Sequence, residues 1–211
     1  MRFLKNMLLM WSTSSSNRVN SLFAIGTPVK MNTEDRNVPV NRIDAYGLDV
    51  CAVFDRSSGT LTVTDNQTGK TTTAPNVFSG NGDNVNKPAA QHIVDKGPLP
   101  AGKYLIGNAY PHTGSPGDNQ WYRLYGENGS GGYSYASFPV ATPSGGTVNR
   151  GRFNLHTGGA SDGCVTVRSD VGFNDPSYPT SKAYDKIKEI LDATEPYKYN
   201  NSTYRGFLTV Q

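Results

Sequence analysis

The segment Phe153-Asn-Leu-His-Thr-Gly-Gly-Ala-Ser-Asp-Gly-Cys-Val-Thr-Val167 decides how this chain folds. Both of its ends, 152–155 and 164–167, carry apolar and β-branched residues that favour strands. Between His156 and Cys164 lie seven residues, of which three are glycines that let the backbone turn tightly. We therefore predict two neighbouring strands, the first ending at His156 and the second beginning at Cys164.

Outward from this segment the pattern is that of a mostly β domain. The 23 glycines, 13 prolines and 12 tyrosines of the 211 residues are typical of strands and loops, whereas a helical bundle needs more Leu and Ala. The predicted fold is a β-sandwich or meander with one C-terminal helix, capped by Thr180 and running to about Ala193. The other predicted strands are 48–54, 60–64, 70–73, 103–106 and 204–210.

Residues 1–40 differ in composition, since they are rich in Ser and Asn and cannot bury much apolar surface. We interpret 1–40 as a tail or adaptor segment and 41–211 as the single domain. The apolar run Met7–Trp11 is too short for a secretory signal, and no run approaches the ~18 residues of a membrane span. The net charge of +3 comes from scattered Lys and Arg, so nucleic acid is not indicated as a partner.

Cys164 and His156 are the candidates for catalysis. A thiol becomes a strong nucleophile when a nearby histidine takes its proton, and we expect a low pKa and fast alkylation for such a cysteine. Gly163 leaves room for a substrate carbonyl and allows backbone N–H groups to face a developing oxyanion. The alternative is a buried structural cysteine beside an incidental loop histidine.

The remaining Cys and His residues are assigned no chemistry. Cys51 lies in an apolar strand, where packing is its expected role, and a bond from it to Cys164 would remove the nucleophile. His92 and His112 are interpreted as surface or loop histidines. No set of side chains has metal-ligand spacing, so neither a metal nor another cofactor is expected.

The stretch 110–146 is rich in Gly, Ser and Pro but also in aromatic residues. We predict a long loop that forms a lid or rim over Cys164, with Trp121 and Tyr122 contacting substrate. The alternative is that these aromatic side chains cover the core. Arg123 and Arg152 are candidates for binding substrate carboxylates, because guanidinium binds a carboxylate bidentately.

Three segments resemble the YkuD-type L,D-transpeptidases, and more closely the divergent effectors of that type delivered by type VI secretion. The segments are Phe153–His156, Ser161–Val165 and Gly97-Pro-Leu-Pro-Ala-Gly-Lys-Tyr104, and the resemblance covers about 47–175. That family has a histidine ending one strand and Ser/Thr-x-Gly-Cys beginning the next. The resemblance implies a YkuD-like domain without a cofactor.

Two positions depart from the family pattern. Asp162 stands where typical enzymes have a second histidine, and the loop before it is shorter, which favours the secreted-effector branch. Thr166 stands where an arginine is usual, so that Arg168 is the nearby substitute. Ser161 and Asp162, at the motif positions, are candidates for substrate binding together with Arg168.

By this resemblance Cys164 attacks the bond between the third and fourth residues of a tetrapeptide stem, and a thioester forms. The backbone carbonyl of Thr157 would orient His156. Water would give L,D-carboxypeptidase activity, and a D-amino acid or second stem would give exchange or L,D-transpeptidase activity.

The resemblance also implies partners and a place of action. It implies peptidoglycan stems as substrate, a cognate immunity protein, a component of the secretion machinery, synthesis in the cytoplasm and action in the periplasm of a target bacterium. The alternatives are another cysteine amidase or peptidase of the cell wall, such as the papain-like NlpC type, and a non-catalytic wall-binding β domain.

Overall fold

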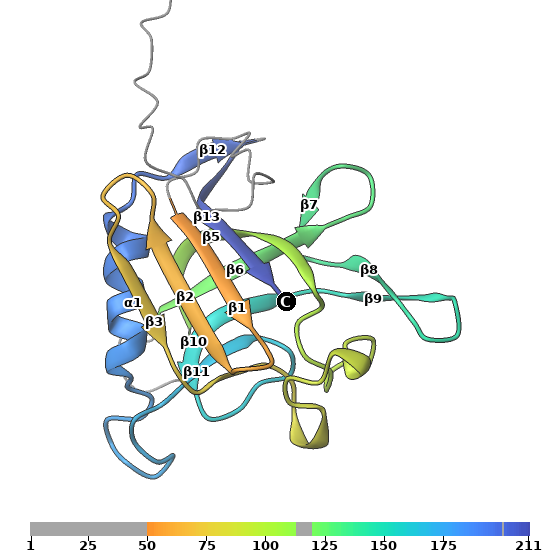
Figure 1. Ribbon diagram of the computed structural model, residues 1–211, viewed down its shortest axis with the longest axis horizontal. Helices are drawn as coiled ribbons and strands as arrows, with labels where there is room; N and C mark the ends of the chain where they lie inside the picture. Colours follow the sequence, from red (N-terminus) through yellow and green to blue (C-terminus); the bar gives the residue numbers. More distant parts are fainter. Residues whose placement is uncertain (1–49, 113–119, 200) are drawn as a thin grey trace, which may run out of the picture. The chain divides into compact units, whose positions relative to one another are not determined.

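In the computed structural model, the residues that the structure describes are 50–112, 120–199 and 201–211. They fold around one long sheet with the strand order β3-β2-β1-β13-β5-β6-β10-β11-β4 (Figure 1). The sheet curls, because β4 at one end of this order comes back to contact β2 near the other. The predicted tail 1–40 lies outside the described residues.

The strands are β1 (Val50–Asp55), β2 (Thr60–Asp65), β3 (Thr71–Ala74), β4 (Val77–Phe78), β5 (Gly102–Pro111), β6 (Gln120–Glu127), β7 (Tyr133–Ser134), β8 (Phe138–Ala141), β9 (Thr147–Arg150), β10 (Phe153–Gly158), β11 (Val165–Arg168), β12 (Tyr197–Tyr199) and β13 (Ser202–Val210).

The first three strands form the predicted antiparallel meander. Along β2, Leu61 and Val63 point into the core and are fully buried, while the threonines between them face outward. On the outer face Thr62 and Thr73 are hydrogen-bonded across the strands at 3.0 Å. The alternation of Thr with apolar residues therefore sets which face of this meander is buried.

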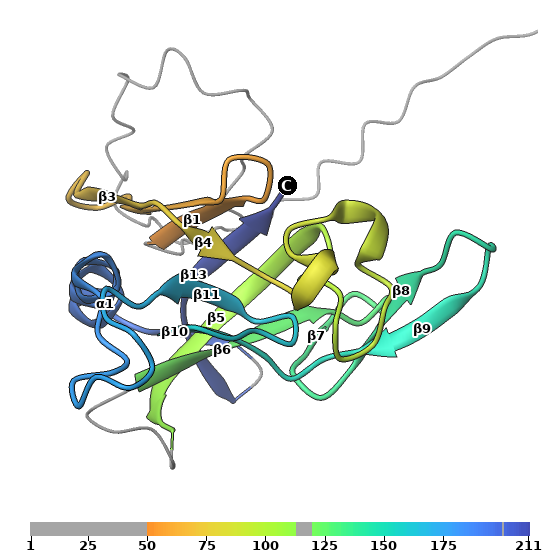
Figure 2. The same ribbon diagram turned by 90° about the horizontal axis from the view of Figure 1, so that it is seen from below.

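The only helix longer than a single turn in the described residues, α1 (Lys182–Ala193), lies against one side of the sheet (Figure 2). Its N-cap is Ser181, whose Oγ accepts a hydrogen bond from the backbone N–H of Tyr184 at 3.3 Å. The predicted cap, Thr180, was one residue too early. One face of the helix is buried, and it contacts β2, β3 and β13. The buried residues of this face are Tyr184, Ile187, Ile190 and Leu191.

The prediction of a long loop over 110–146 is wrong for about half of its described residues, and 113–119 lie outside the described residues. Residues 120–127 form β6 in the middle of the sheet, and 138–150 contain the β8–β9 hairpin, which projects from the body (Figure 1). The turn-forming residues gather instead at the ends of these strands, as at 129–132 and 144–146. The β-forming run Trp121–Tyr125 between them was obscured by that composition.

The two strands of the deciding segment are neighbours, as predicted, and they run parallel with Leu155 opposite Val165. Strand β10 continues two residues past His156, so this residue lies within the strand and not at its end. The connection 159–164 folds back along β10 before β11 begins.

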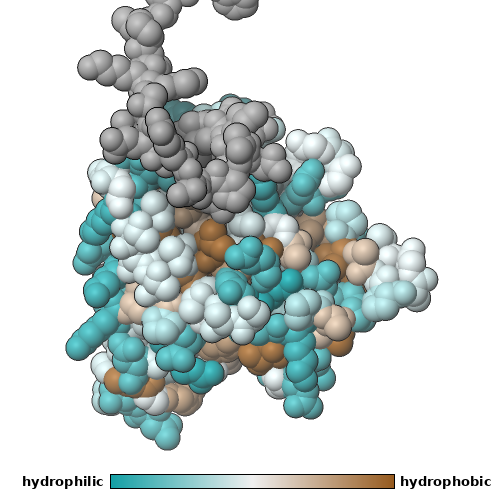
Figure 3. All heavy atoms as spheres, in the orientation of Figure 1, coloured by the Kyte–Doolittle hydropathy of each residue, from teal (hydrophilic) through white to brown (hydrophobic). Residues whose placement is uncertain are grey.

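Two short 3-10 helices, η1 (Gly82–Asn84) and η2 (Pro88–Ala90), lie between β4 and β5. The face of the molecule seen in Figure 3 is largely polar, with small apolar patches. Among the described residues, the large apolar side chains that are well exposed are Val94 and Phe173.

Candidate active site

Cys164 is the last residue of the connection that joins β10 to β11, and its side chain is partly buried. Two serines fix the backbone around it. Ser161 Oγ donates to the carbonyl of Cys164 at 2.7 Å, and Ser79 Oγ donates to the carbonyl of Gly163 at 2.8 Å. The cysteine thus lies in a loop that is hydrogen-bonded at two consecutive carbonyls.

Glycine is required immediately before the cysteine. Gly163 has φ of +118°, which side chains rarely adopt, and a Cβ there would lie 2.6 Å from Arg150 Nη2 and 3.0 Å from the carbonyl of Gly97. The Gly97-Pro-Leu-Pro segment therefore lies directly against the loop that carries Cys164.

Arg150, the last residue of β9, joins these segments and was not singled out from the sequence. Its buried guanidinium donates to the carbonyls of Gln91, Pro98 and Gly97 at 2.7, 2.6 and 2.9 Å. Nothing in the sequence distinguishes this arginine from the others, because its partners are backbone atoms more than 50 residues away.

His156 is 5% exposed and lies opposite Thr166 in the parallel pair. Its Nδ1 is 2.9 Å from the carbonyl oxygen of Thr157, as the sequence resemblance implied. Because a carbonyl can only accept, the neutral ring carries its hydrogen on Nδ1 and its lone pair on Nε2. Nε2 then accepts from the Thr166 hydroxyl, 3.2 Å away.

An aromatic stack covers the His156 ring. The Trp121 ring lies 4.1 Å from it, and the His112 ring lies 3.7 Å from the other face of Trp121. Three buried polar atoms in and beside the stack have no hydrogen-bond partner within the described residues: His112 Nδ1, Trp121 Nε1 and Thr157 Oγ1. His112 directly follows β5, outside any strand, as the prediction of a surface or loop histidine allows, and its ring is stacked on Trp121.

The sulfur of Cys164 and the ring of His156 lie on the same side of β10. Asn154 Nδ2 lies 3.8 Å from the sulfur. Asn154 and His156 are two residues apart in β10, so their side chains point to the same face of the strand. The hydrogen bonds of the described residues do not join the sulfur to the imidazole directly.

Both groups are uncharged at neutral pH. Burial is the main cause that lowers the pKa of His156 to about 4; the hydrogen bond to Thr157 opposes the shift and His112 adds to it. Burial raises the pKa of the Cys164 thiol, and hydrogen bonds from Asn154 partly offset the rise. The expected low thiol pKa is wrong, because desolvation disfavours the thiolate in this partly closed site.

The other predicted site residues lie in different surroundings. Tyr122 is fully buried and donates to Asp192 at 2.7 Å, so the prediction of substrate contact is wrong, since β6 turns this side chain into the core. Trp121 faces the opposite way and contacts His156. Arg152 is exposed, and Asp162 accepts from Asn81 Nδ2 at 3.1 Å.

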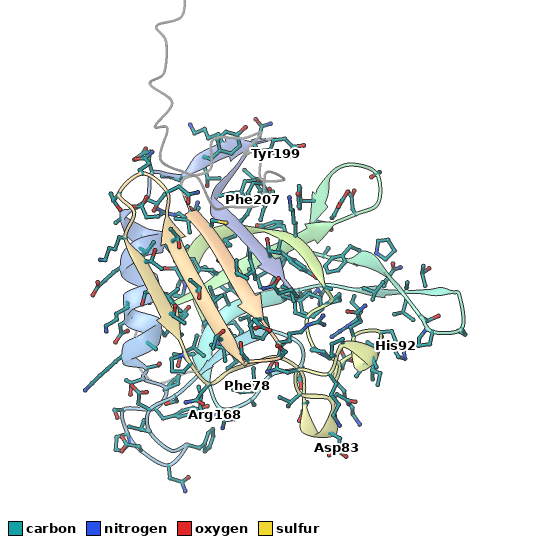
Figure 4. All side chains as sticks on the ribbon, viewed as in Figure 1. Phe78, Asp83, His92, Arg168, Tyr199 and Phe207 are labelled. Carbon is teal, nitrogen blue, oxygen red and sulfur yellow. The ribbon has the colours of Figure 1, made fainter. Side chains whose placement is uncertain are left out.

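Two arginines contact aromatic rings. Arg123 lies over the rings of Tyr110 and Tyr135, at 4.7 and 5.1 Å. Arg168 lies 4.8 Å over the ring of Phe78, next to it in Figure 4. The figure also shows His92 on the segment that joins β4 to β5.

Cys51 and Cys164 do not form a disulfide with each other. No three His, Cys, Asp or Glu side chains of the described residues are grouped so that they could hold a metal ion. In the same part of the chain, no helix has the length and apolar character that a membrane crossing needs.

Cys164 directly precedes β11, and His156 lies within the parallel neighbour β10, in a mostly β domain. This arrangement differs from that of the papain-like alternative, whose cysteine begins a helix. The model of the Tlde1 domain matches residues 73–186, so this chain belongs to the Tlde1 domain family, the type VI secretion effectors of the L,D-transpeptidase type. The matched residues thus form an L,D-transpeptidase-like effector domain of this family. No curated protein matches the chain.

Three solved structures resemble the chain at low identity. The helical cell shape determining protein Pgp2 from Campylobacter jejuni has a TM-score of 0.42 and 13% identity, covering 77% of this chain and 47% of its own. An L,D-transpeptidase from Mycobacterium tuberculosis has a TM-score of 0.36 and 14% identity, covering 78% and 58%. An L,D-transpeptidase from Mycobacterium smegmatis has a TM-score of 0.34 and 14% identity, covering 78% and 59%. The chain thus spans less than two thirds of these proteins.

Proposed function

We propose that Cys164 attacks the carbonyl between the third and fourth residues of a peptidoglycan tetrapeptide stem. The S–C bond forms as the thiol proton passes to His156, and the C–N bond then breaks as His156 returns a proton to the departing D-Ala amine. Water resolves the thioester in L,D-carboxypeptidase activity. The amine of a D-amino acid or of a second stem resolves it in exchange or cross-linking.

The observation that carries this proposal is the state of His156. Its Nδ1–H faces the Thr157 carbonyl at 2.9 Å, so the lone pair is on Nε2, and the ring is neutral and able to accept a proton. The sulfur lies on the same side of β10, beside Asn154. For proton transfer, Nε2 has to exchange the Thr166 hydroxyl for the thiol hydrogen, because Nε2 faces that hydroxyl at 3.2 Å.

The loop residues have separate roles in this mechanism. The N–H of Gly163 is hydrogen-bonded to Ser161 Oγ at 3.3 Å, so the N–H of Cys164 itself is the proposed donor to the oxyanion. Ser161 acts by fixing the loop. Asp162 and Arg152 are both exposed, and Arg152 is the proposed partner of a stem carboxylate.

Around the base, polar atoms are available to substrate. Trp121 Nε1 and Thr157 Oγ1 are buried without partners in the described residues and are proposed to bind peptide groups of the stem. Arg168 lies at the far end of β11 and is the proposed second contact for a carboxylate.

Family membership supports a setting for this reaction. We propose that the protein is made in the cytoplasm, exported with a component of the secretion machinery, and active in the periplasm of a target bacterium. A producing cell would be protected by a cognate immunity protein.

The test is mass spectrometry of purified muropeptides after incubation with the protein, with and without added D-amino acid. We expect loss of D-Ala from tetrapeptides, and exchange products when the amino acid is present. Cys164→Ala should abolish both while Cys51→Ala, which also removes one thiol, should not. Turnover by a folded Cys164→Ala variant at the wild-type rate would show that the mechanism is wrong.

A further inference from the structure

Asn154 is held in one orientation by its neighbours on three sides. Its Oδ1 accepts from the hydroxyl of Tyr110 at 3.0 Å and from that of Tyr135 at 3.2 Å. Its Nδ2 donates to the carbonyl of Arg152 at 3.0 Å. A carbonyl only accepts, so Nδ2 faces Arg152 and Oδ1 faces the two phenols, whereas a flipped amide would place its oxygen against the Arg152 carbonyl.

The orientation of the amide directs its remaining N–H toward the sulfur of Cys164, which lies 3.8 Å from Nδ2. Burial raises the pKa of Tyr110 to about 12, so this phenol remains a donor throughout the working pH range. The guanidinium of Arg123 lies over the rings of Tyr110 and Tyr135 and keeps the two phenols together.

The sulfur needs such a donor because its surroundings disfavour negative charge. Desolvation and the carboxylate of Asp162 both raise the pKa of the thiol, whereas the backbone N–H of Asn154, its side-chain amide and the charge of Arg150 lower it. Arg150 uses its hydrogen bonds on the carbonyls of the 91–98 segment, so the side-chain donor that reaches the sulfur is the amide.

We propose that Asn154 is a catalytic residue that donates a hydrogen bond to the Cys164 sulfur as it loses its proton, with Tyr110 and Tyr135 as positioning residues for the amide. The role of Asn154 in turnover rests on the proposed function. The effect of Asn154 on the thiol does not rest on it, because alkylation of the sulfur requires no cell-wall substrate.

The test measures the rate of Cys164 alkylation by iodoacetamide from pH 6 to 10, with peptide mass spectrometry separating Cys164 from Cys51. Asn154→Asp keeps the shape and the oxygen that faces the tyrosines but places an oxygen toward the sulfur. We expect alkylation at neutral pH to fall about tenfold or more, since a hydrogen bond to a charged group contributes about 1.5–3 kcal/mol. Asn66→Asp, an equal charge change at an exposed turn residue, should leave the rate unchanged.

A second variant tests the positioning. Tyr110→Phe/Tyr135→Phe keeps Asn154 but frees its amide to rotate, and the rate should fall about threefold, a smaller loss than in Asn154→Asp. If Asn154→Asp does not fold, this double variant gives the test with the same readout. Alkylation of Cys164 at the wild-type rate in both folded variants would overturn the proposal.

Turnover separates the two proposals. If the wild type leaves muropeptides unchanged while the Asn154 variant still alters alkylation, only the proposed function fails. If the wild type cleaves muropeptides and the Asn154 variant alkylates and cleaves as the wild type does, only the role of Asn154 fails.

Discussion

Burial keeps the imidazole of His156 neutral, and this determines how stability depends on pH. The unfolded chain binds a proton at this residue below about pH 6.5, whereas the folded protein binds it only near pH 4. The stabilising contribution is therefore fully present above pH 6.5 and is lost as the pH falls toward 4. We expect the loss to reach about 3 kcal/mol.

Urea denaturation at pH 7.0 and 4.5 checks this expectation. Other groups also titrate in this range, so the measurement compares the wild type with His156→Gln, which carries no proton. The wild type should lose more stability than the variant between the two pH values. Equal losses would mean that the ring is exposed to water in solution.

Gly163 allows a second prediction for a single residue. Gly163 and Gly145 both have a positive φ, but only Gly163 is crowded by neighbouring atoms. Gly163→Ala places a methyl group 2.6 Å from Arg150 Nη2 and from Phe153 Cε1, whereas Gly145, at φ +84°, has nothing within 4 Å. Both substitutions cost about 1 kcal/mol of backbone strain. Gly163→Ala should cost about 2 kcal/mol more and should slow turnover.

The control, Gly145→Ala, lies at the tip of the β8–β9 hairpin and should retain full activity. Thermal unfolding and muropeptide turnover measure the two effects. If both variants lose the same stability, the loop at Gly163 can move away from Arg150, and the close contact is not a constraint.

At the scale of the elements, Tyr184 ties α1 to the strands of the site. Its hydroxyl lies 2.6 Å from the carbonyl oxygen of Gln120 on β6 and 3.1 Å from that of Leu155 on β10. Tyr184→Phe leaves these buried carbonyls without this donor, and we expect a loss of about 1–2 kcal/mol in the free energy of unfolding. An unchanged denaturation midpoint would show that water replaces the hydroxyl.

The elements that could be predicted from sequence are those whose signal is local. Alternating Thr and apolar residues predicted the β1–β3 meander, and the glycines between His156 and Cys164 predicted that β10 and β11 are neighbours. Strand β6 was missed because its β-forming run is flanked by turn residues on both sides.

The candidate site was predictable only in part, because only some of its residues are close together in the sequence. Cys164 and His156 are eight residues apart, and the carbonyl of Thr157 adjoins the ring, so one motif contains them all. Asn154, two residues before His156, could have been found from the alternation of a strand. Arg150, Trp121 and His112 reach the site through long-range pairing or backbone contacts that leave no local pattern.

At the scale of the whole molecule, the prediction concerns the compartment in which the protein acts. The proposed substrate lies outside the inner membrane, so expression in the bacterial cytoplasm should be harmless and fusion to a periplasmic signal should be toxic. Growth and cell shape measure the effect, and exported Cys164→Ala is the control. If the folded protein is harmless in the cytoplasm and equally harmless when exported, the wall-binding alternative is favoured.

The protonated state of Cys164 also bears on how the protein survives oxidising surroundings. Peroxides and disulfides react with the thiolate, and the pKa of this thiol is raised in a partly closed site. A sulfur that ionises only as it meets its acyl substrate is oxidised slowly while it waits. If the protein acts outside the cell as proposed, peroxide should oxidise Cys164 more slowly than it converts an exposed, ionised cysteine to sulfenic acid.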